Sequence, residues 1–134
     1  MAAFDEHASA YDSWFFDNQN LLTSELKLVA HFLDTDSEIL SIGCGSGLFE
    51  SLLAKDYDIH IKYGIEPSKD MAAVAEKRGL QVDISPAETC EIEPNKFDII
   101  VFNGSVSYIS DLDACIKKAF NALKSGGKLI LIDV

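Results

Sequence analysis

The chain has 134 residues, 48% of them hydrophobic and 25% charged, which suffices for one domain with a real core but not for two. Acidic residues outnumber basic ones by 22 to 11, and the net charge of −11 argues against partners such as nucleic acid or an anionic membrane surface. The three cysteines are far apart and form no CxxC pair or Cys/His cluster, so neither a zinc site nor a disulfide framework is indicated, and a reduced, cytoplasmic setting is expected.

The first third of the chain is predicted to be helical. Ala3–Asp12 and Asn20–Leu33 are expected to form two helices, and apolar residues recur in the second at a spacing of three to four. Met1–His7 has neither a basic nor an apolar segment and is therefore not a signal peptide. No apolar run approaches membrane-spanning length, so no membrane span is expected.

The rest of the chain alternates predicted strands with predicted helices. Strands are expected at 38–42, 59–66, 80–84, 97–103 and 128–134, and helices at 48–55, 69–78 and 111–124. Residues 85–96 are expected to be a loop with one helical turn, and the Ser-Gly-Gly at 125–127 is expected to end the last helix. This alternation predicts parallel βαβ units in an open, doubly wound sheet.

Four sequence features follow the predicted strand ends. They are the glycine loop Gly43–Gly47, Glu66, the pair Ala87 and Glu88, and the pair Asn103 and Gly104. In an open parallel sheet, ligands bind outside the carboxyl ends of the strands, at the point where the strand order reverses. The four features are therefore expected to meet at one edge of the sheet and to form a binding site there.

The glycine loop and Glu66 together indicate which ligand the site holds. Glycines at 43, 45 and 47 allow a sharp turn and close approach of the backbone to a ligand. The dinucleotide fingerprint G-x-G-x-x-G does not fit, since Leu48 stands where it requires Gly or Ala, and no P-loop lysine follows. A carboxylate at Glu66 is able to accept two hydrogen bonds from a ribose diol, which predicts a ribonucleoside carrying a small group. Taken singly, the loop is also consistent with a plain turn and Glu66 with a solvated acid.

Five segments of the sequence resemble the successive motifs of class I S-adenosylmethionine-dependent methyltransferases. They are "FDEHASAYDSWF", "ILSIGCGSG", "GIEPSKDM", "FDIIVFNGSVSYISD" and "ALKSGGKLILID". The resemblance is strongest to the small-molecule type that includes the ubiquinone/menaquinone-biosynthesis-like enzymes, and it covers essentially the whole chain. It implies a single α/β domain over 1–134, with a helical cap at 1–37 and a Rossmann-like, mostly parallel sheet at 38–134.

The resemblance also implies a set of residues that bind S-adenosylmethionine, with S-adenosylhomocysteine as the product. The set comprises Tyr11, Gly43, Cys44, Gly45, Glu66, Pro67, Ser68, Met71, Ala87, Glu88, Asn103 and Gly104. Its glycine-loop members would line the methionine portion, and Glu66 would bind the ribose hydroxyls. The members at 67–71 and 87–88 would border the adenine. Those at 103–104 would lie near the sulfonium and the ammonium, with Tyr11 closing over the methionine end.

Several of these residues have a simpler interpretation. Met71 is also consistent with a core position, and Glu88 with a surface acid. Tyr11, together with Trp14 and Phe15, is also consistent with an apolar contact on the sheet.

Two departures from the family pattern affect the expectations. Ser41 stands where the family usually has an acidic residue that helps to hold the ammonium end of the cofactor, although a serine hydroxyl still forms hydrogen bonds. In the family the sheet continues after the fifth strand with a helix and an antiparallel hairpin, whereas this sequence ends at Val134. The sequence is consistent with a fragment of a longer enzyme, with a natural short form, or with an edge covered by a second copy. Because an apolar edge strand promotes pairing, we expect a homodimer.

The expected reaction is direct displacement of a methyl group onto a small-molecule acceptor. A general base is needed only where the acceptor must lose a proton. His7 is the only histidine near the predicted pocket, and Ser105 and Tyr108, which follow the fourth strand, are candidates to contact an acceptor. The sequence identifies no catalytic residue and no metal site. The alternative is a noncatalytic cofactor-binding module or a fragment of a longer methyltransferase. A nicotinamide-dependent oxidoreductase is disfavoured by the glycine spacing and by the helices that precede the first strand.

Overall fold

The structure, a computed structural model, describes residues 13, 17–103 and 109–132. Its elements in chain order are α2 (Gln19–Phe32), β1 (Ile39–Ile42), α3 (Leu48–Tyr57), β2 (Tyr63–Ile65), α4 (Lys69–Lys77), β3 (Gln81–Asp83), β4 (Phe97–Asn103), α5 (Leu112–Ala122) and β5 (Leu123–Ile132). The four helices in this part begin and end within about three residues of their predicted limits. The helix expected at Ala3–Asp12 lies outside the described residues.

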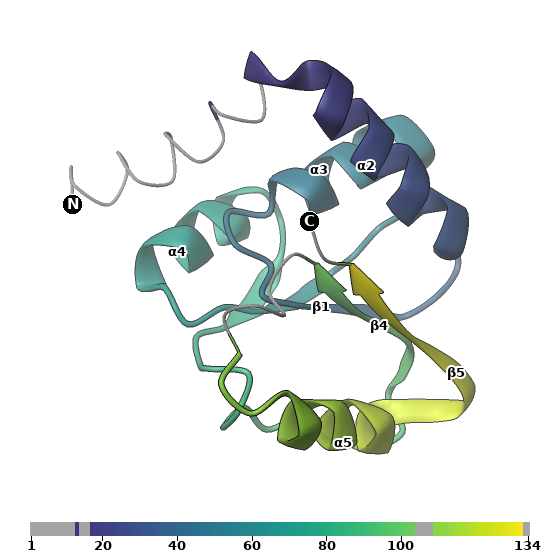
Figure 1. The fold of residues 1–134 in the computed structure, drawn as a ribbon, viewed down its shortest axis with the longest axis vertical. Coiled ribbons are helices and arrows are strands. Elements are labelled where there is room, and N and C mark those ends of the chain that lie inside the picture. The colour runs from purple at the N-terminus through teal and green to yellow at the C-terminus, as the bar shows by residue number, and fades with distance from the viewer. Residues whose placement is uncertain (1–12, 14–16, 104–108, 133–134) are drawn as a thin grey trace.

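The five strands form one parallel sheet in the order β3-β2-β1-β4-β5. The chain runs outward from the central strand β1 through β2 to β3 and then crosses back to β4 and β5 (Figure 1). The strand order therefore reverses between β1 and β4, which is where open α/β sheets bind their ligands. This arrangement confirms the predicted doubly wound sheet.

Helices cover both faces of the sheet. α2, α3 and α4 lie on one side and α5 on the other (Figure 1). Successive residues of a strand point to opposite faces, so Ile39 packs with α2 and α3 while Leu40 and Ile42 pack with α5. All four residues of β1 are buried, as expected for a strand with helices on both sides.

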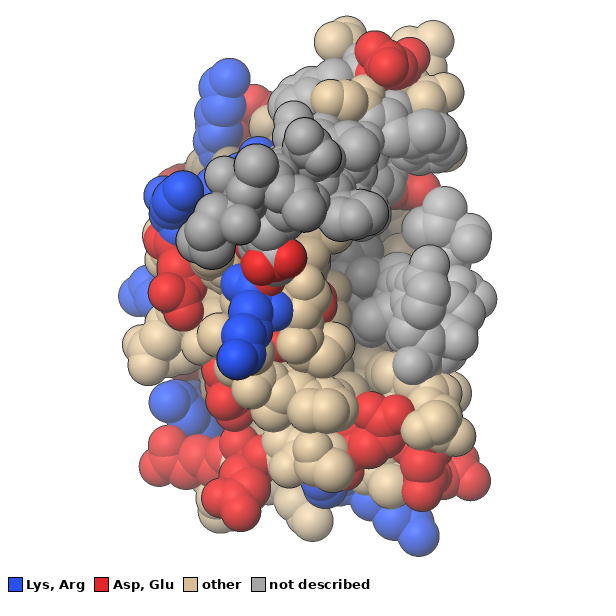
Figure 2. All heavy atoms as spheres, turned by 90° about the vertical axis from the view of Figure 1, so that its left-hand side faces the viewer, with Lys and Arg blue, Asp and Glu red and all other residues tan. Residues whose placement is uncertain are grey.

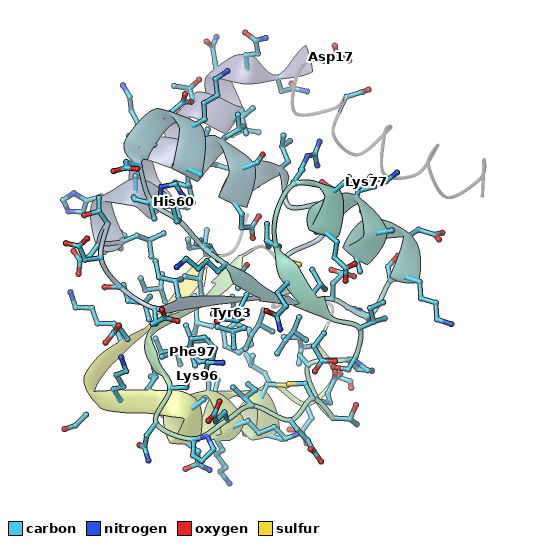
Figure 3. The ribbon with its side chains drawn as sticks, turned by 180° about the vertical axis from the view of Figure 1, so that it is seen from behind. Asp17, His60, Tyr63, Lys77, Lys96 and Phe97 are labelled. Carbon is cyan, nitrogen blue, oxygen red and sulfur yellow. The ribbon has the colours of Figure 1, made fainter. Side chains whose placement is uncertain are left out.

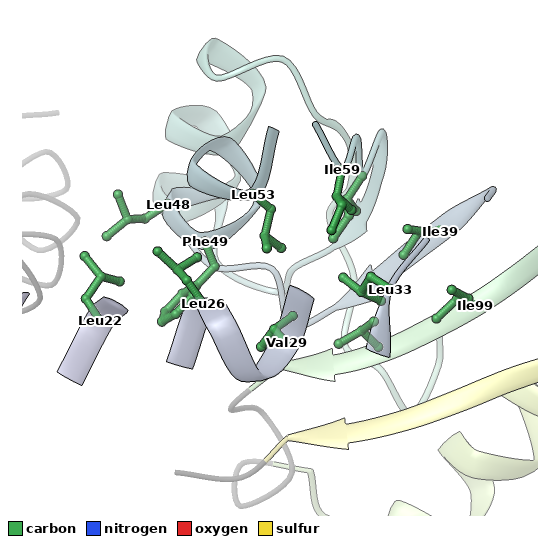
Figure 4. Packing of buried hydrophobic residues seen from close by; sticks show 12 residues of the cluster. Leu22, Leu26, Val29, Leu33, Ile39, Leu48, Phe49, Leu53, Ile59 and Ile99 are labelled. Atoms are coloured by element: carbon green, nitrogen blue, oxygen red, sulfur yellow. The ribbon is translucent and has the colours of Figure 1, made fainter. Parts of the chain in front are cut away.

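The α2–α3 layer is held by apolar side chains spaced along one face of each helix. Figure 4 shows residues of α2 facing residues of α3 above the sheet. The buried positions of the two helices in this cluster are Leu22, Leu26, Val29, Leu48, Phe49 and Leu53. Burial of a leucine-sized side chain contributes about 1.5–3 kcal/mol, so this layer fixes where α3, and the loop before it, lie on the sheet.

Two predicted details are wrong, both for reasons of backbone pairing. The alternating pattern over 59–66 forms a strand only at β2. Leu40 of β1 pairs with Tyr63, and only Ile39 precedes Leu40 in β1, so β1 is too short to pair with the residues before Tyr63. Ile59 and Ile61 are nevertheless buried against the α2–α3 layer, which explains the alternating pattern. The Ser-Gly-Gly at 125–127 does not end the last helix, which stops at Ala122. It lies inside β5, where the pairing with β4 shifts register.

Candidate functional site

The glycine loop connects β1 to α3 at the carboxyl edge of the sheet. Its three glycines have positive φ angles of 75°, 58° and 75°, a conformation that residues with a side chain rarely adopt. Apart from its chain neighbours, no atom of the described residues lies within 4 Å of a Cβ atom placed on Gly45, so the described part of the chain leaves space beside the middle of the loop. Gly47 occupies the N-cap of α3 and supplies no side-chain hydrogen bond to the first turn. The middle of the loop and the N-cap of α3 therefore carry no side chain.

Glu66 ties the glycine loop to the start of α4. One carboxylate oxygen accepts a hydrogen bond from the Gly45 N–H and the other from the Ser68 N–H, each at 2.9 Å. The side chain is only 9% exposed, and the N–H groups of Gly43 and Cys44 bind the carbonyl of Ile65 beside it. Each carboxylate oxygen has a second lone pair that these bonds do not use. The structure thus brings together the two features that the sequence singled out first.

Ser68 begins α4 next to Glu66. Its hydroxyl oxygen accepts a hydrogen bond from the Met71 N–H at 3.3 Å, which is the N-cap arrangement that stabilises a helix start by about 1 kcal/mol. Met71 is half-buried and Pro67 is exposed. All three residues lie on the segment held by Glu66, so this part of the predicted set shares one edge with the glycine loop.

Cys44 packs under the loop against Gly64 of β2. A Cβ atom on Gly64 would lie 2.7 Å from the Cys44 sulfur, so the glycine makes room for the thiol. Burial raises the pKa of Cys44, and the carboxylates of Glu50 and Glu66 raise it further. The group is therefore a neutral thiol and serves as packing rather than as a nucleophile.

Glu50, in the first turn of α3, is a buried acid that the sequence analysis missed. Its side chain is 3% exposed, and its carboxylate accepts a hydrogen bond from the Ser41 hydroxyl at 2.7 Å. Burial raises the pKa of Glu50 to about 7, while the Ser41 hydrogen bond and the charge of Arg78 act in the opposite direction. Arg78 also donates to the carbonyl of Ser46 in the glycine loop at 2.8 Å. The available signal was Ser41, a polar residue in a strand buried on both faces, which requires a polar partner.

Ala87 and Glu88 lie beside the start of α5. The Glu88 carboxylate accepts hydrogen bonds from the hydroxyl and the N–H of Ser110, at 2.6 and 2.9 Å. These bonds hold the pKa of Glu88 below its usual range. Ala87 packs with the apolar cluster on the α5 side of the sheet. The bonds to Ser110 therefore link the segment after β3 to the segment after β4.

The remaining members of the predicted set are only partly described. Asn103 is the last residue of β4, at the same edge of the sheet as the ends of β1 and β2. Tyr11 and Gly104 lie outside the described residues, as do His7, Ser105 and Tyr108. Among the described residues, no group of three or more His, Cys, Asp or Glu side chains could hold a metal ion. No helix of the described part is long and apolar enough to cross a membrane.

Two hollows are lined by described residues, and neither lining includes a residue of the glycine loop. One of about 410 Å³ is on the α5 side of the sheet, where Lys96 lies over the ring of Tyr63 at 4.4 Å beside Phe97 (Figure 3). The other, of about 260 Å³, is lined by residues of α3, of the segment before β2 and of the turn after α4, including Glu50, His60 and Arg78.

Comparison with known proteins gives a consistent result. A family model described as "Methyltransferase domain" matches residues 40–131. An uncharacterised protein of Methanocaldococcus jannaschii is 34% identical over 98% of this chain. The malonyl-[acyl-carrier protein] O-methyltransferase of Priestia megaterium is 29% identical over 95% of it. A solved structure from Thermotoga maritima, described as an SAM-dependent methyltransferase and possible histamine N-methyltransferase, superposes with a TM-score of 0.83 and 32% identity over 96% of this chain.

The match covers only part of each of these proteins. The chain spans 60% of the Methanocaldococcus protein and 48% of the Priestia enzyme. It spans 58% of the chain in the Thermotoga structure.

Proposed function

The chain belongs to the methyltransferase domain family, and we propose that it binds S-adenosylmethionine at the glycine loop and transfers the methyl group to a small-molecule acceptor. The observation that carries the proposal is the placement of Glu66. Its carboxylate joins the Gly45 and Ser68 N–H groups, and these two bonds leave a second lone pair on each oxygen.

The residues of this edge fit the parts of S-adenosylmethionine. Two neighbouring ribose hydroxyls match the two oxygens of Glu66, and hydrogen bonds to an ionised carboxylate are the stronger kind. The start of α3 suits the carboxylate of the methionine portion, since the positive end of the helix dipole lies there and Gly47 carries no side chain. Met71, half-buried beside Ser68, offers a polarisable apolar contact to the adenine. Gly43, Cys44 and Asn103 would surround the methionine end.

When bound, S-adenosylmethionine supplies a methyl group already activated by its sulfonium. The task of this chain's own residues is therefore to hold the donor rigidly and to orient it toward the acceptor. Alignment of this kind supplies on the order of 7–11 kcal/mol of the barrier reduction. The Glu66 bonds contribute by fixing the glycine loop against α4, so the site needs little reorganisation on binding.

A small molecule is the proposed class of acceptor. The Priestia relative acts on malonyl-[acyl-carrier protein], and the Thermotoga structure is described as a possible histamine N-methyltransferase. The net charge of −11 disfavours a nucleic-acid acceptor. Figure 2 shows acidic side chains gathered on the lower part of one face, and such a surface also disfavours a nucleic-acid acceptor. A homodimer that covers β5 stays a prediction.

Isothermal titration of the chain with S-adenosylhomocysteine, with NAD as a second ligand, tests the proposal. We expect micromolar binding of S-adenosylhomocysteine and none of NAD. Glu66→Ala removes the carboxylate proposed to accept hydrogen bonds from the ribose, and also the hydrogen bond from the Gly45 N–H. Binding of S-adenosylhomocysteine should therefore weaken roughly 10- to 100-fold or more.

Glu76→Ala is the matched control, because Glu76 is an exposed glutamate on α4. It should bind like the unmodified chain, and circular dichroism should show that both variants are folded. Equal affinity of Glu66→Ala and the unmodified chain would contradict the assigned role of Glu66. Binding of neither ligand to the unmodified chain would contradict the proposed function.

A further inference from the structure

Glu50 is a fully buried acid that none of the roles proposed above uses. In β1, Ile39 packs toward α3 while Leu40 and Ile42 pack toward α5, so Ser41 also points toward α3. Glu50 meets Ser41 there, one turn beyond the glycine loop, with Oε2 2.7 Å from the hydroxyl oxygen. The pair therefore joins the central strand to the helix whose start is proposed to receive the methionine portion of the donor.

Charged and titratable groups reach Glu50 from several elements. Glu66 lies at the end of β2, Arg78 follows α4, and Cys44 belongs to the glycine loop. His60 and Lys62, which precede β2, line the same 260 Å³ hollow as Glu50. From α2, the residues packed in the cluster with α3 are apolar. Of the charged groups that act on its pKa, Arg78 favours the ionised form of Glu50 and Glu66 disfavours it.

We propose that Glu50 is a positioning residue that favours the positively charged donor over its neutral-sulfur product, and that donor binding is coupled to ionisation of the Glu50 carboxyl. This inference rests on the proposed function. A buried carboxyl gives up its proton more readily when a positive charge enters its surroundings. In the proposed site, the sulfonium of S-adenosylmethionine would add a positive charge at the glycine loop, which directly precedes the turn of α3 that carries Glu50, whereas the sulfur of S-adenosylhomocysteine is uncharged.

The coupling has a defined sign. A donor that favours the ionised form of Glu50 causes the Glu50 carboxyl to lose its proton when the donor binds to a chain in which that carboxyl is protonated. Its affinity therefore rises as the pH rises toward the pKa of Glu50 in the free protein, which burial raises to about 7. Should binding lower that pKa by about two units, the affinity for S-adenosylmethionine would be about tenfold higher at pH 7.0 than at pH 5.5. S-adenosylhomocysteine should show a smaller change.

Titration calorimetry with both ligands at pH 5.5 and 7.0, in two buffers of different ionisation enthalpy, tests this inference. This range lies below the usual pKa of an α-amino group, so the ligand's own ammonium stays charged. The unmodified chain should release protons on binding S-adenosylmethionine. Its preference for S-adenosylmethionine over S-adenosylhomocysteine should be stronger at pH 7.0 than at pH 5.5. Glu50→Gln should bind both ligands with nearly the same affinity at the two pH values. Glu76→Gln, an exposed change on α4, should behave like the unmodified chain.

Ser41→Ala provides a second variant with a different prediction. The Ser41 hydroxyl lowers the pKa of Glu50, so its removal should move the midpoint of the affinity change to higher pH. A role of Glu50 in folding alone would not move that midpoint. The same pH dependence in Glu50→Gln and the unmodified chain, with donor binding intact, would overturn the inference but leave the proposed function standing. Failure of the unmodified chain to bind either ligand would overturn both.

Discussion

Replacing Glu50 with glutamine should change how the stability of the folded chain depends on pH. Burial raises the pKa of Glu50 from its ordinary value of 4.5 to about 7. The folded state therefore binds a proton more tightly than the unfolded state between these values. The stability that this proton supplies is fully present below pH 4.5 and is lost as the pH rises through 7. At about 1.4 kcal/mol per pH unit, the loss amounts to about 3 kcal/mol.

Glutamine has nearly the shape of the protonated acid, and its side-chain oxygen accepts the Ser41 hydrogen bond, but it does not titrate. Urea unfolding of the two chains at pH 5 and pH 8 measures the effect. Relative to the unmodified chain, Glu50→Gln should gain about 2–3 kcal/mol in free energy of unfolding between pH 5 and pH 8. Glu76→Gln is the control and should show no such gain. An unchanged pH dependence in Glu50→Gln would refute the reasoning, because it would mean that the buried carboxyl is not held protonated.

Two further predictions concern other contacts of the site. Gly64→Ala places a Cβ atom 2.7 Å from the Cys44 sulfur, so it should destabilise the fold by about 1–3 kcal/mol in urea unfolding. Adding Cys44→Ala should restore part of that loss, and no restoration would contradict the contact. Ser110→Ala removes the hydroxyl that most lowers the pKa of Glu88, so that pKa should rise toward its ordinary value. Carboxyl-carbon NMR over a pH titration measures it, and an unchanged value would show that the hydroxyl has no such effect.

The topology and the meeting of the glycine loop with Glu66 could both be predicted from the sequence. Parallel strands place their carboxyl ends at one edge, so residues that follow β1 and β2 must be neighbours there. The spacing of the glycines and the acid at the next strand end therefore predicted, without any three-dimensional information, that these residues lie together in the candidate site. The start of α4 at Lys69 was also predicted, and Ser68 before it is a residue type preferred at the N-cap.

Other features depend on contacts that no local pattern records. Glu50 stands in an ordinary helical stretch, and its burial follows from Ser41 and Arg78, which come from other elements. Ile59 and Ile61 are buried, as the alternating pattern at 59–62 suggests. A strand also needs a neighbouring strand to pair with, and β1 is too short to pair with these residues. The Ser-Gly-Gly at 125–127 suggested a helix end, whereas α5 ends at Ala122 and the glycines lie where β5 shifts its register against β4.

The measurement that tests the central claim most directly is an NMR titration of the isotopically labelled chain with S-adenosylhomocysteine. The account predicts that the amide signals of Gly43–Gly47 and of Ser68–Met71 shift most, because the ligand lies on the glycine loop and against the start of α4. The amides around Tyr63 and Lys96, at the hollow on the α5 side, should shift little. The largest shifts at that hollow, or no shift at saturating ligand, would contradict the assignment of the glycine loop and Glu66 as the donor site.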